Sequence, residues 1–263
     1  MQLLPLDFPE IDSSGMNQIE NKIRAIYRLI TFSRKHLADD LLDSFLSSTK
    51  DLKELLSIKN AQMEAQNEED ARDYLRGLRA ALDFVTKEIG CDRTFADRLQ
   101  LFHLFRIISP VSHLEHPNRF RDTHVQVGSY MCPEPAAING LVTELFHRIE
   151  LIKNPVMRAI YFHHELIRIH PFVDGNGRVT RIAKNWMLMY DLYPPIFIKD
   201  ENEKEEYIAT LSASFRRLDK NPRSWNVATI DFFKQEIDRI YQNANTIHRT
   251  LQGIGHSNRG MIL

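Results

Sequence analysis

The chain has only two cysteines among its 263 residues, Cys91 and Cys132, and they lie far apart in the sequence. Two isolated cysteines provide neither a disulfide framework nor the paired spacing of a zinc site, which fits a reducing compartment. The sequence also lacks any run of 18 apolar residues, so we expect no membrane-spanning helix. The first residues contain no basic segment followed by an apolar core, so no signal peptide is predicted. These absences predict a cytoplasmic protein.

The chain has little net charge. Its 34 Lys and Arg residues balance 35 Asp and Glu residues, which gives a formal net charge of −1. Such a chain has no general electrostatic attraction for nucleic acid or for an anionic membrane surface, so neither partner is expected. It contains no internal repeat and no low-complexity tract. With 43% hydrophobic residues, it can form one good-sized core with a helical extension.

Apolar residues recur every three or four positions through most of the sequence, which is the spacing of helices that bury one face. Helices are predicted from about Asn17, around Leu41–Leu46 and Leu52–Leu56, and over Tyr74–Gly90, Thr94–Pro110, Ala136–Ile152, Pro155–Arg168, Arg178–Tyr190, Glu201–Leu218 and Trp225–Leu251. Thr94 is the expected N-cap of its helix. Residues 62–72 fit either a solvated helix or a loop, and residues 253–263 fit a flexible tail.

The stretch His170–Arg181, HPFVDGNGRVTR, combines residues that suit phosphate chemistry. Gly175 and Gly177 can adopt positive φ, and the amides of such a turn can form an anion-binding nest. The helical pattern that follows places a helix N-terminus, which favours anions, beside this nest. The sequence therefore predicts a phosphate site where the turn meets the helix.

The charged residues of this stretch each have a predicted role. Asp174 offers a hard oxygen ligand that suits Mg²⁺ on phosphates. Arg178 and Arg181 are neighbours on one helix face and suit the β- and γ-phosphates. His170 is the only residue here that can take up a proton near pH 7. A glycine turn, a lone histidine or two arginines at a helix start would be ordinary separately, but their joint occurrence indicates a functional site.

The stretch resembles the signature of the Fic (filamentation induced by cAMP) family, His-x-Phe-x-(Asp/Glu)-Gly-Asn-Gly-Arg-x-x-Arg. Every defined position is matched, namely His170, Phe172, Asp174, Gly175, Asn176, Gly177, Arg178 and Arg181. The resemblance implies a helical core with a small β-hairpin flap and an N-terminal helical extension. It divides the chain into an N-terminal helical region at 1–95, a catalytic domain at 96–240 and a helix end and tail at 241–263.

The same resemblance implies transfer of AMP from ATP to a Tyr, Ser or Thr hydroxyl of a target protein, with this chain itself among the candidate targets. His170 would take the hydroxyl proton, Asp174 would hold Mg²⁺, and Asn176 with the loop amides would hold the α- and β-phosphates. Phe172 would anchor the loop in the core. Homo-oligomers are compatible with the sequence.

The N-terminal helix resembles, in part, an inhibitory helix that some Fic proteins carry, with the pattern Ser/Thr-x-x-x-Glu-(Gly/Asn). Glu20 and Asn21 match its end, whereas Met16 departs from its first position. The resemblance implies that Glu20 pairs with Arg181 and blocks the γ-phosphate site. Glu20 can equally be a solvated helical acid.

Residues 111–135 interrupt the helical pattern. His124–Gly128 alternates polar and apolar residues and Tyr130-Met131 follows, so a hairpin is predicted. The resemblance implies a flap whose edge pairs with the main chain of the target, formed by Val125, Gln126, Val127 and Gly128. A purely structural hairpin is one alternative. A metal site on His113, His116 and His124 is another, although their spacing fits no standard zinc pattern.

Two further positions have alternative interpretations. His163 shares a helix face with His170 and is predicted to support the loop by hydrogen bonding. Tyr207 either borders the nucleotide base or belongs to the core, as aromatic residues at helical spacing commonly do. The sequence His163-His164-Glu165 is no metalloprotease motif, because the position that would need a second histidine is Arg168.

Two alternative functions stay open. Some relatives of the family transfer phosphate or phosphocholine, but those related to the death-on-curing toxin carry Lys where Arg178 stands, so Arg178 favours AMP. The second alternative is a non-catalytic module that senses nucleotide and interacts with a partner.

Overall fold

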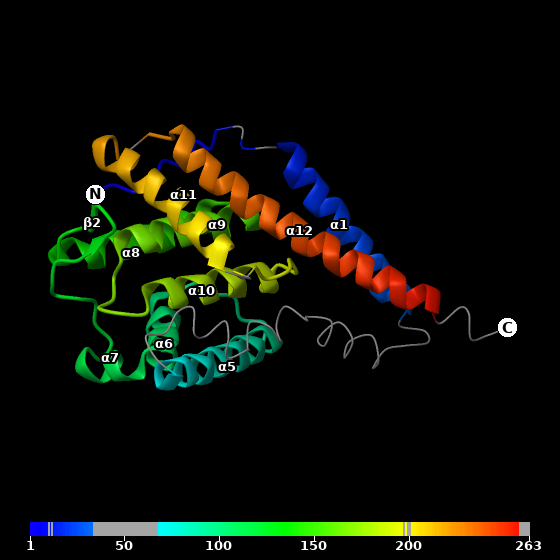
Figure 1. Ribbon diagram of the computed structural model, residues 1–263, viewed down its shortest axis with the longest axis horizontal. Coiled ribbons are helices and arrows are strands. Elements are labelled where there is room, and N and C mark those ends of the chain that lie inside the picture. Colours follow the sequence, from blue (N-terminus) through cyan, green and yellow to red (C-terminus); the bar gives the residue numbers. More distant parts are fainter. Residues whose placement is uncertain are drawn as a thin grey trace.

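The computed structural model describes residues 1–9, 11, 13–33, 68–196, 198, 201–222 and 224–257. The helices and strands in these ranges are α1 (Ser13–Ser33), α5 (Glu68–Gly90), α6 (Arg98–Ile108), α7 (Pro110–Glu115), β1 (Gln126–Val127), β2 (Tyr130–Met131), α8 (Pro135–Leu151), α9 (Pro155–Ile169), α10 (Asn176–Tyr190), α11 (Glu201–Lys220) and α12 (Val227–Ser257). The predicted class, all-α with a small hairpin, is confirmed (Figure 1). The helices expected between Leu41 and Leu56 lie outside the described residues.

Helix α9 runs through the middle of the molecule (Figure 1). From Ala159 to Ile169 its apolar and polar side chains alike are buried. Helices α8 and α10 pack along it, and α5 and α6 pack against α10. Helix α12 contacts both α9 and α11. A helix that is buried all round must satisfy its own polar side chains internally. Because α9 is fixed on several sides, the loop that follows it starts from a rigid position.

Most predicted helices form, with corrections at their ends. The N-cap of α6 is Asp97 and not Thr94: the Asp97 carboxylate accepts from the main-chain N–H of Gln100, 2.8 Å away, and the Gln100 side chain accepts from the Asp97 N–H in return. This reciprocal pair is a capping box, and it satisfies two N–H groups, whereas Thr94 offers only one acceptor. The Thr94 side chain therefore lies outside the helix.

Two segments predicted to be irregular are helical. Residues Pro110–Glu115 form α7, which has proline at its first position, where the missing N–H costs nothing. Helix α12 continues to Ser257, so residues 253–257 are helical and do not belong to a flexible tail. Residues 258–263 lie outside the described part. Helix α10 begins at Asn176, slightly earlier than the apolar periodicity indicated.

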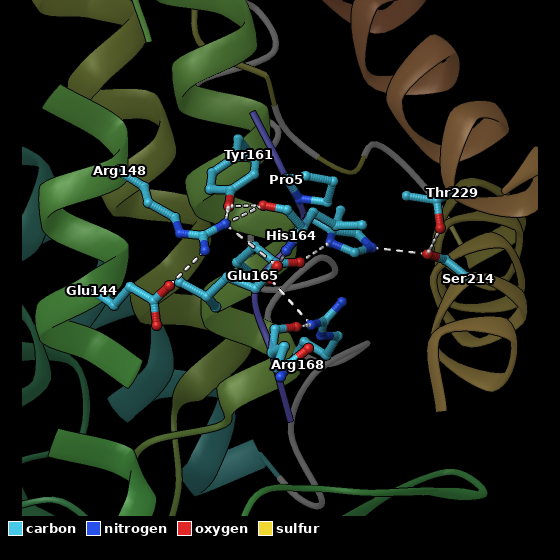
Figure 2. Close-up of polar contacts among 12 residues, drawn as sticks. Pro5, Glu144, Arg148, Tyr161, His164, Glu165, Arg168, Ser214 and Thr229 are labelled. Atoms are coloured by element: carbon cyan, nitrogen blue, oxygen red, sulfur yellow. Dashed lines mark hydrogen bonds and ion pairs between the residues drawn. The ribbon is translucent and has the colours of Figure 1, made fainter. Parts of the chain in front are cut away.

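The first residues of the chain pass through the core beside α8 and α9 (Figure 2). Leu3 and Leu4 are buried. The N–H of Leu4 donates to Glu165 over 3.2 Å, and its carbonyl accepts from Tyr161 over 2.6 Å and from Arg148 over 2.5 Å. These bonds satisfy a main chain that water cannot reach. The N-terminal segment is thus a structural part of the fold.

The carboxylate that holds this segment belongs to a buried polar network (Figure 2). Glu165 contacts His164 at 2.7 Å and Arg168 at 3.3 Å, and all three side chains are buried. His164 reaches Ser214 on α11, which in turn contacts Thr229 on α12. Although burial opposes ionisation, the Arg168 guanidinium and the hydrogen bond from His164 keep the pKa of Glu165 below its usual value. The network joins α9, α11 and α12.

Helix α1 packs along α12 (Figure 1). Ile26 meets Ala244, and Ile23 and Ile247 pack around this contact, while Ile19 joins the main core. Residues from the predicted N-terminal region therefore share a core with the predicted catalytic domain, and the boundaries at 95 and 240 stay predictions. Within the described ranges, every helix is too short or too polar to cross a lipid bilayer.

Candidate active site

His170 lies at the C-terminal end of α9 and turns the chain sharply. Its backbone is left-handed, with φ 52° and ψ 60°, and its N–H donates to the carbonyl of Leu166 at 2.9 Å. Its Nδ1 is buried within the fold. Burial is the main cause that lowers the pKa of His170 to about 4, and the positive charge of Arg121 adds to this effect. At neutral pH the ring is therefore uncharged and can accept a proton.

The loop after His170 is held by Phe172 and Asn176. The Phe172 ring is 1% exposed and stacks on Phe105 with 4.1 Å between ring centroids, so the prediction that it anchors the loop is confirmed. The Asn176 side chain accepts from the Phe172 N–H and donates to the Phe172 carbonyl, both at 2.8 Å. The Asn176 amide is 3% exposed and both of its ends are occupied. It braces the loop, and a contact of this side chain with phosphate stays a prediction.

The two glycines of the loop have different conformations. Gly175 has φ 74° and precedes α10, as predicted for a turn. A Cβ at Gly175 would collide with the Ser109 hydroxyl and lie 3.3 Å from the Ser109 Cβ. The loop can approach Ser109 this closely only because residue 175 is glycine. Gly177 is helical without positive φ, which corrects the prediction. The absence of a side chain at Gly177 leaves room for Arg181. A guanidinium nitrogen of Arg181 lies 3.2 Å from the position that a Cβ on residue 177 would take.

Asp174 and Arg178 form an ion pair on the first turn of α10. The Asp174 carboxylate lies 2.7 Å from the Arg178 guanidinium and accepts a hydrogen bond from Ser109 at 3.2 Å. The Asp174 side chain is 58% exposed and the Arg178 side chain 25%. Because solvent reaches both side chains of this partly exposed pair, a cation can bind Asp174 and an anion can bind Arg178 when the pair separates. Asp174 and Arg178 are therefore both accessible to a ligand at the start of α10.

The donor set at this turn fits a magnesium ion. Asp174 offers one accessible carboxylate, and Mg²⁺ in nucleotide sites commonly takes one or two carboxylates together with phosphate oxygens and water. No group of three metal-ligating side chains occurs in the described ranges. In particular, His124 pairs with Glu134 at 3.3 Å and His113 contacts Asn118 at 3.4 Å, so the histidine metal site is not supported. A metal here would depend on the nucleotide for most of its ligands.

His163 and Tyr207 belong to a buried cluster between α9, α11 and α12. His163 Nε2 lies 3.0 Å from the Tyr207 hydroxyl, and its Nδ1 lies 3.3 Å from the carboxylate of Glu236. His163 therefore does not bond the catalytic loop as predicted, because its ring faces α11 and α12. Tyr207 is 5% exposed and stacks on His163, which is the core interpretation; a contact with the nucleotide base stays a prediction.

This cluster also contains a buried ion pair. Lys184 on α10 lies 2.5 Å from Glu236, which also pairs with Arg239 at 2.8 Å. Because Lys184, His163 and Arg239 surround it, the pKa of Glu236 is held well below its ordinary value despite burial. Burial together with the charge of Lys184 lowers the pKa of His163 to about 3. The cluster fixes α10 against α12 behind the catalytic loop.

The predicted hairpin is present. Gln126 pairs with Met131 and Val127 with Tyr130 in antiparallel register, and Gly128, with φ 59°, lies in the turn and not in a strand. Of the predicted flap residues, Val125 extends the ladder by accepting from the Cys132 N–H at 3.1 Å.

Arg121 links this hairpin to the loop, and sequence reasoning missed it. Its Nε donates to the His170 carbonyl at 2.7 Å, and its main-chain N–H donates to Pro171 at 2.9 Å. Its partners are carbonyl groups, which no residue pattern reveals.

Glu20 occupies a position different from the predicted one. Its carboxylate pairs with Arg24, one turn along α1, at 3.7 Å, and its charge acts on Tyr193, which follows the C-terminal end of α10. The phosphate loop lies at the opposite end of that helix. Helix α1 packs along α12 (Figure 1), where Ile26 meets Ala244, and the pairing of Glu20 with Arg181 stays a prediction.

Comparison with known proteins places these residues in a family. Residues 96–188, which include the loop, the hairpin and α6 to α9, match the Fic/DOC family. The chain carries a Fic domain. The resemblance seen in the sequence is therefore confirmed, and the Fic domain contains every residue of the His170–Arg181 signature.

Relatives and solved structures agree with this assignment. A protein adenylyltransferase Fic from Culex quinquefasciatus is 29% identical over 166 residues, covering 61% of this chain and 33% of the relative. One from Drosophila grimshawi is 30% identical over 144 residues, covering 52% and 29%. This Fic chain thus spans about a third of the length of these curated relatives. A Fic-domain signaling protein from Bacteroides thetaiotaomicron has the same fold, with TM-score 0.71, 18% identity, and coverage of 91% of this chain and 98% of that one.

Proposed function

We propose that the chain is a protein adenylyltransferase that moves AMP from ATP to a hydroxyl group of a protein. The observation that carries the proposal is the position of His170, an uncharged imidazole at the end of α9, beside the anion-favouring start of α10. The printed name of the insect relatives, protein adenylyltransferase Fic, supports the same reaction.

In the proposed reaction the target hydroxyl oxygen attacks the α-phosphorus of ATP and pyrophosphate leaves. His170 accepts the hydroxyl proton, which it can do at neutral pH because its pKa lies at about 4 in the free protein. The triphosphate adds negative charge nearby, which raises the pKa of His170 and makes it a stronger base when substrate is present. Most of the catalysis would then be positioning and electrostatics, as is usual for transfer of phosphate groups.

The N-terminal turn of α10 would hold the triphosphate. The main-chain N–H groups at Gly175, Asn176 and Gly177 begin the helix and have the polarity that anions need. Binding would exchange the Asp174–Arg178 ion pair for two new contacts, with Mg²⁺ on the Asp174 carboxylate and phosphate oxygens on Arg178. Arg181 would contact the leaving pyrophosphate. When bound, the metal ion would neutralise charge on the phosphates.

The hairpin would dock the target. Val127 is half-buried and Gln126 exposed on a two-residue strand, so β1 has an outer edge to which an extended segment can add. Main-chain hydrogen bonds to the hairpin would require the target segment to be extended, but they would depend little on its amino-acid sequence. The identity of the target would then depend on contacts outside the hairpin.

The test compares the intact protein with His170→Ala after incubation with ATP and Mg²⁺. Mass spectrometry of the protein and of a lysate is expected to show an adenylyl group added by the intact protein. The variant is expected to bind ATP and to transfer AMP about 10²-fold more slowly, the scale of general-base loss. A phosphoryl group in place of AMP would favour the alternative transferase. Nucleotide binding without any modification would favour the sensing module.

Inhibition by Glu20 stays a prediction. For Glu20 to block the γ-phosphate site, its carboxylate would have to leave Arg24 and reach Arg181, which requires α1 to move along or away from α12. The comparison is auto-adenylylation by the wild type and by Glu20→Gly, with Asn17→Gly on the same helix as the control for lost helix propensity. A rise confined to Glu20→Gly supports inhibition, and equal rates contradict it.

A further inference from the structure

Arg121 is a buried cation with no carboxylate at ion-pair distance among the described residues, although the charge of Glu134 acts on it. It is 2% exposed, and it forms no ion pair with any residue in the described ranges. Burial lowers the pKa of its guanidinium, because removal from water disfavours the charged form. A buried charge is costly unless hydrogen bonds compensate for lost hydration. The contacts that compensate for it therefore indicate what the residue does.

The first set of contacts is with the end of α9. Arg121 Nε donates to the His170 carbonyl at 2.7 Å, and a terminal nitrogen lies 3.4 Å from the Ile169 carbonyl. The last carbonyls of a helix lack partners within the helix, and a cation is favoured beside them. His170 is also left-handed, a conformation that glycine usually supplies at this position. Arg121 thus stabilises the strained backbone that carries the imidazole.

The second set of contacts is with both stems of the hairpin. A terminal nitrogen of Arg121 donates to the Thr123 carbonyl, which precedes β1, at 2.6 Å. The other donates to the Pro133 carbonyl, which follows β2, at 2.7 Å. The rigid, planar fork of arginine can reach these carbonyls and that of His170 at once, whereas the single ammonium of lysine cannot.

We propose that Arg121 is a positioning residue that sets the hairpin at a fixed place relative to His170, so that a hydroxyl on a docked target meets the imidazole. This inference rests on the proposed function, since it assumes that the hairpin docks the target. A displacement of about 1 Å between the reacting groups can lower a rate about 10²-fold. One buried side chain that bonds to both parts would prevent such a displacement.

The charge of Arg121 adds a second, separable effect. It lowers the pKa of His170, while Asp174 opposes it and burial contributes most. Replacing Arg121 by a neutral residue removes a positive charge from beside the ring, so the imidazolium form becomes less unfavourable and the pKa of His170 rises. The acidic limb of the rate profile would then move to higher pH. A lysine at the same position would keep the charge and lose the fork.

The test uses Arg121→Lys and Arg121→Gln, with Arg148→Lys as the matched control. Arg148 also donates to main-chain carbonyls, those of Leu3 and Leu4, but on the N-terminal segment. Both Arg121 variants are expected to bind ATP within about twofold of wild type and to lose about tenfold or more in kcat for AMP transfer. Only Arg121→Gln is expected to shift the acidic limb upward. The control should lose thermal stability and keep its kcat.

Hydrogen exchange separates this proposal from the proposed function. In both Arg121 variants, amides of the hairpin and of the loop after α9 should exchange faster together, and in Arg148→Lys they should not. This result would support the positioning role even if the wild type transferred no AMP. Unchanged exchange in both segments, or a kcat loss equal to that of Arg148→Lys, would overturn it. If Arg121→Gln proves too unstable to purify, exchange and kcat of Arg121→Lys decide.

Discussion

Asn176 and Phe172 are joined by two hydrogen bonds, each 2.8 Å, that run in opposite directions between a side-chain amide and a main chain. The amide acts as a substitute for a neighbouring strand, since it offers one donor and one acceptor to a single residue. The Phe172 ring is held in turn by its stack on Phe105. The loop therefore keeps its shape without a ligand.

Asn176→Ala is expected to destabilise the protein by roughly 2–4 kcal/mol, because it leaves two buried main-chain groups unpaired. AMP transfer should also fall, since the loop amides lose their fixed positions. The measurement is urea unfolding, compared with Asn139→Ala on the exposed face of α8. A loss below about 0.5 kcal/mol would show that the loop does not depend on this brace.

Gly175→Ala is expected to lower both stability and nucleotide binding. A methyl group would meet Ser109, and alanine at φ 74° costs about 1–2 kcal/mol by itself. Adding Ser109→Gly removes the collision but not the backbone cost, so the double variant should recover part of the loss. The single Ser109→Gly variant is the reference. Full recovery would mean that the left-handed backbone costs nothing here.

Asp174→Asn tests the metal site. The variant keeps the size of the side chain and removes the charge that would hold Mg²⁺. With Mg²⁺ present, it should bind ATP about tenfold more weakly than the wild type does, whereas in EDTA the two proteins should bind ATP nearly equally. Isothermal calorimetry in both buffers gives the two affinities. If ATP binding weakened equally in both buffers, Asp174 would act only by positioning Arg178 through their ion pair, and it would not hold Mg²⁺.

The stability of the protein should fall as the pH drops below about 6.5. His163 has its pKa lowered to about 3 in the folded protein, against about 6.5 in an unfolded chain, so the unfolded state binds more protons between these values. Stability is therefore full above pH 6.5 and is lost toward pH 3, by about 1.4 kcal/mol per pH unit for each such group. His164 and His170 act in the same direction.

His163→Gln should make this loss less steep by about 1.4 kcal/mol per pH unit, because one titrating group is gone. Gln can still reach the Tyr207 hydroxyl, so the core contact is largely kept. Urea unfolding at several values between about pH 4 and 7 gives the slope. His147→Gln, on an exposed face of α8, is the control. An unchanged slope in His163→Gln would show that His163 is not the group that titrates.

Sequence reasoning identified the helices, the hairpin and the catalytic loop, because each has a local signal. The apolar spacing of α9, the alternation before Gly128 and the dense motif at His170–Arg181 are all visible within a few residues. Phe172 was correctly placed in the core for the same reason. The positive φ at Gly175 followed from the turn.

The contacts that could not be predicted from the sequence depend on the direction in which a side chain points. Asn176 has the right chemistry for phosphate, but its amide turns inward to Phe172. His163 faces Tyr207 and not the loop. Arg121 binds carbonyls up to 49 positions away, and these leave no trace in residue type. The position of Glu20 depends on how α1 docks against α12, so its inhibitory role stays a prediction.

The burial of Leu4 has a consequence for how the chain is made. Its N–H pairs with Glu165, 161 positions later in the sequence. At a translation rate of about 5–20 residues per second, the N-terminal segment waits roughly 8–30 seconds before its partner leaves the ribosome. Closing so long a loop is also slow compared with forming the helices themselves. Leu4 thus reaches its native place late, and until Glu165 has been synthesised its apolar side chain is open to chaperones.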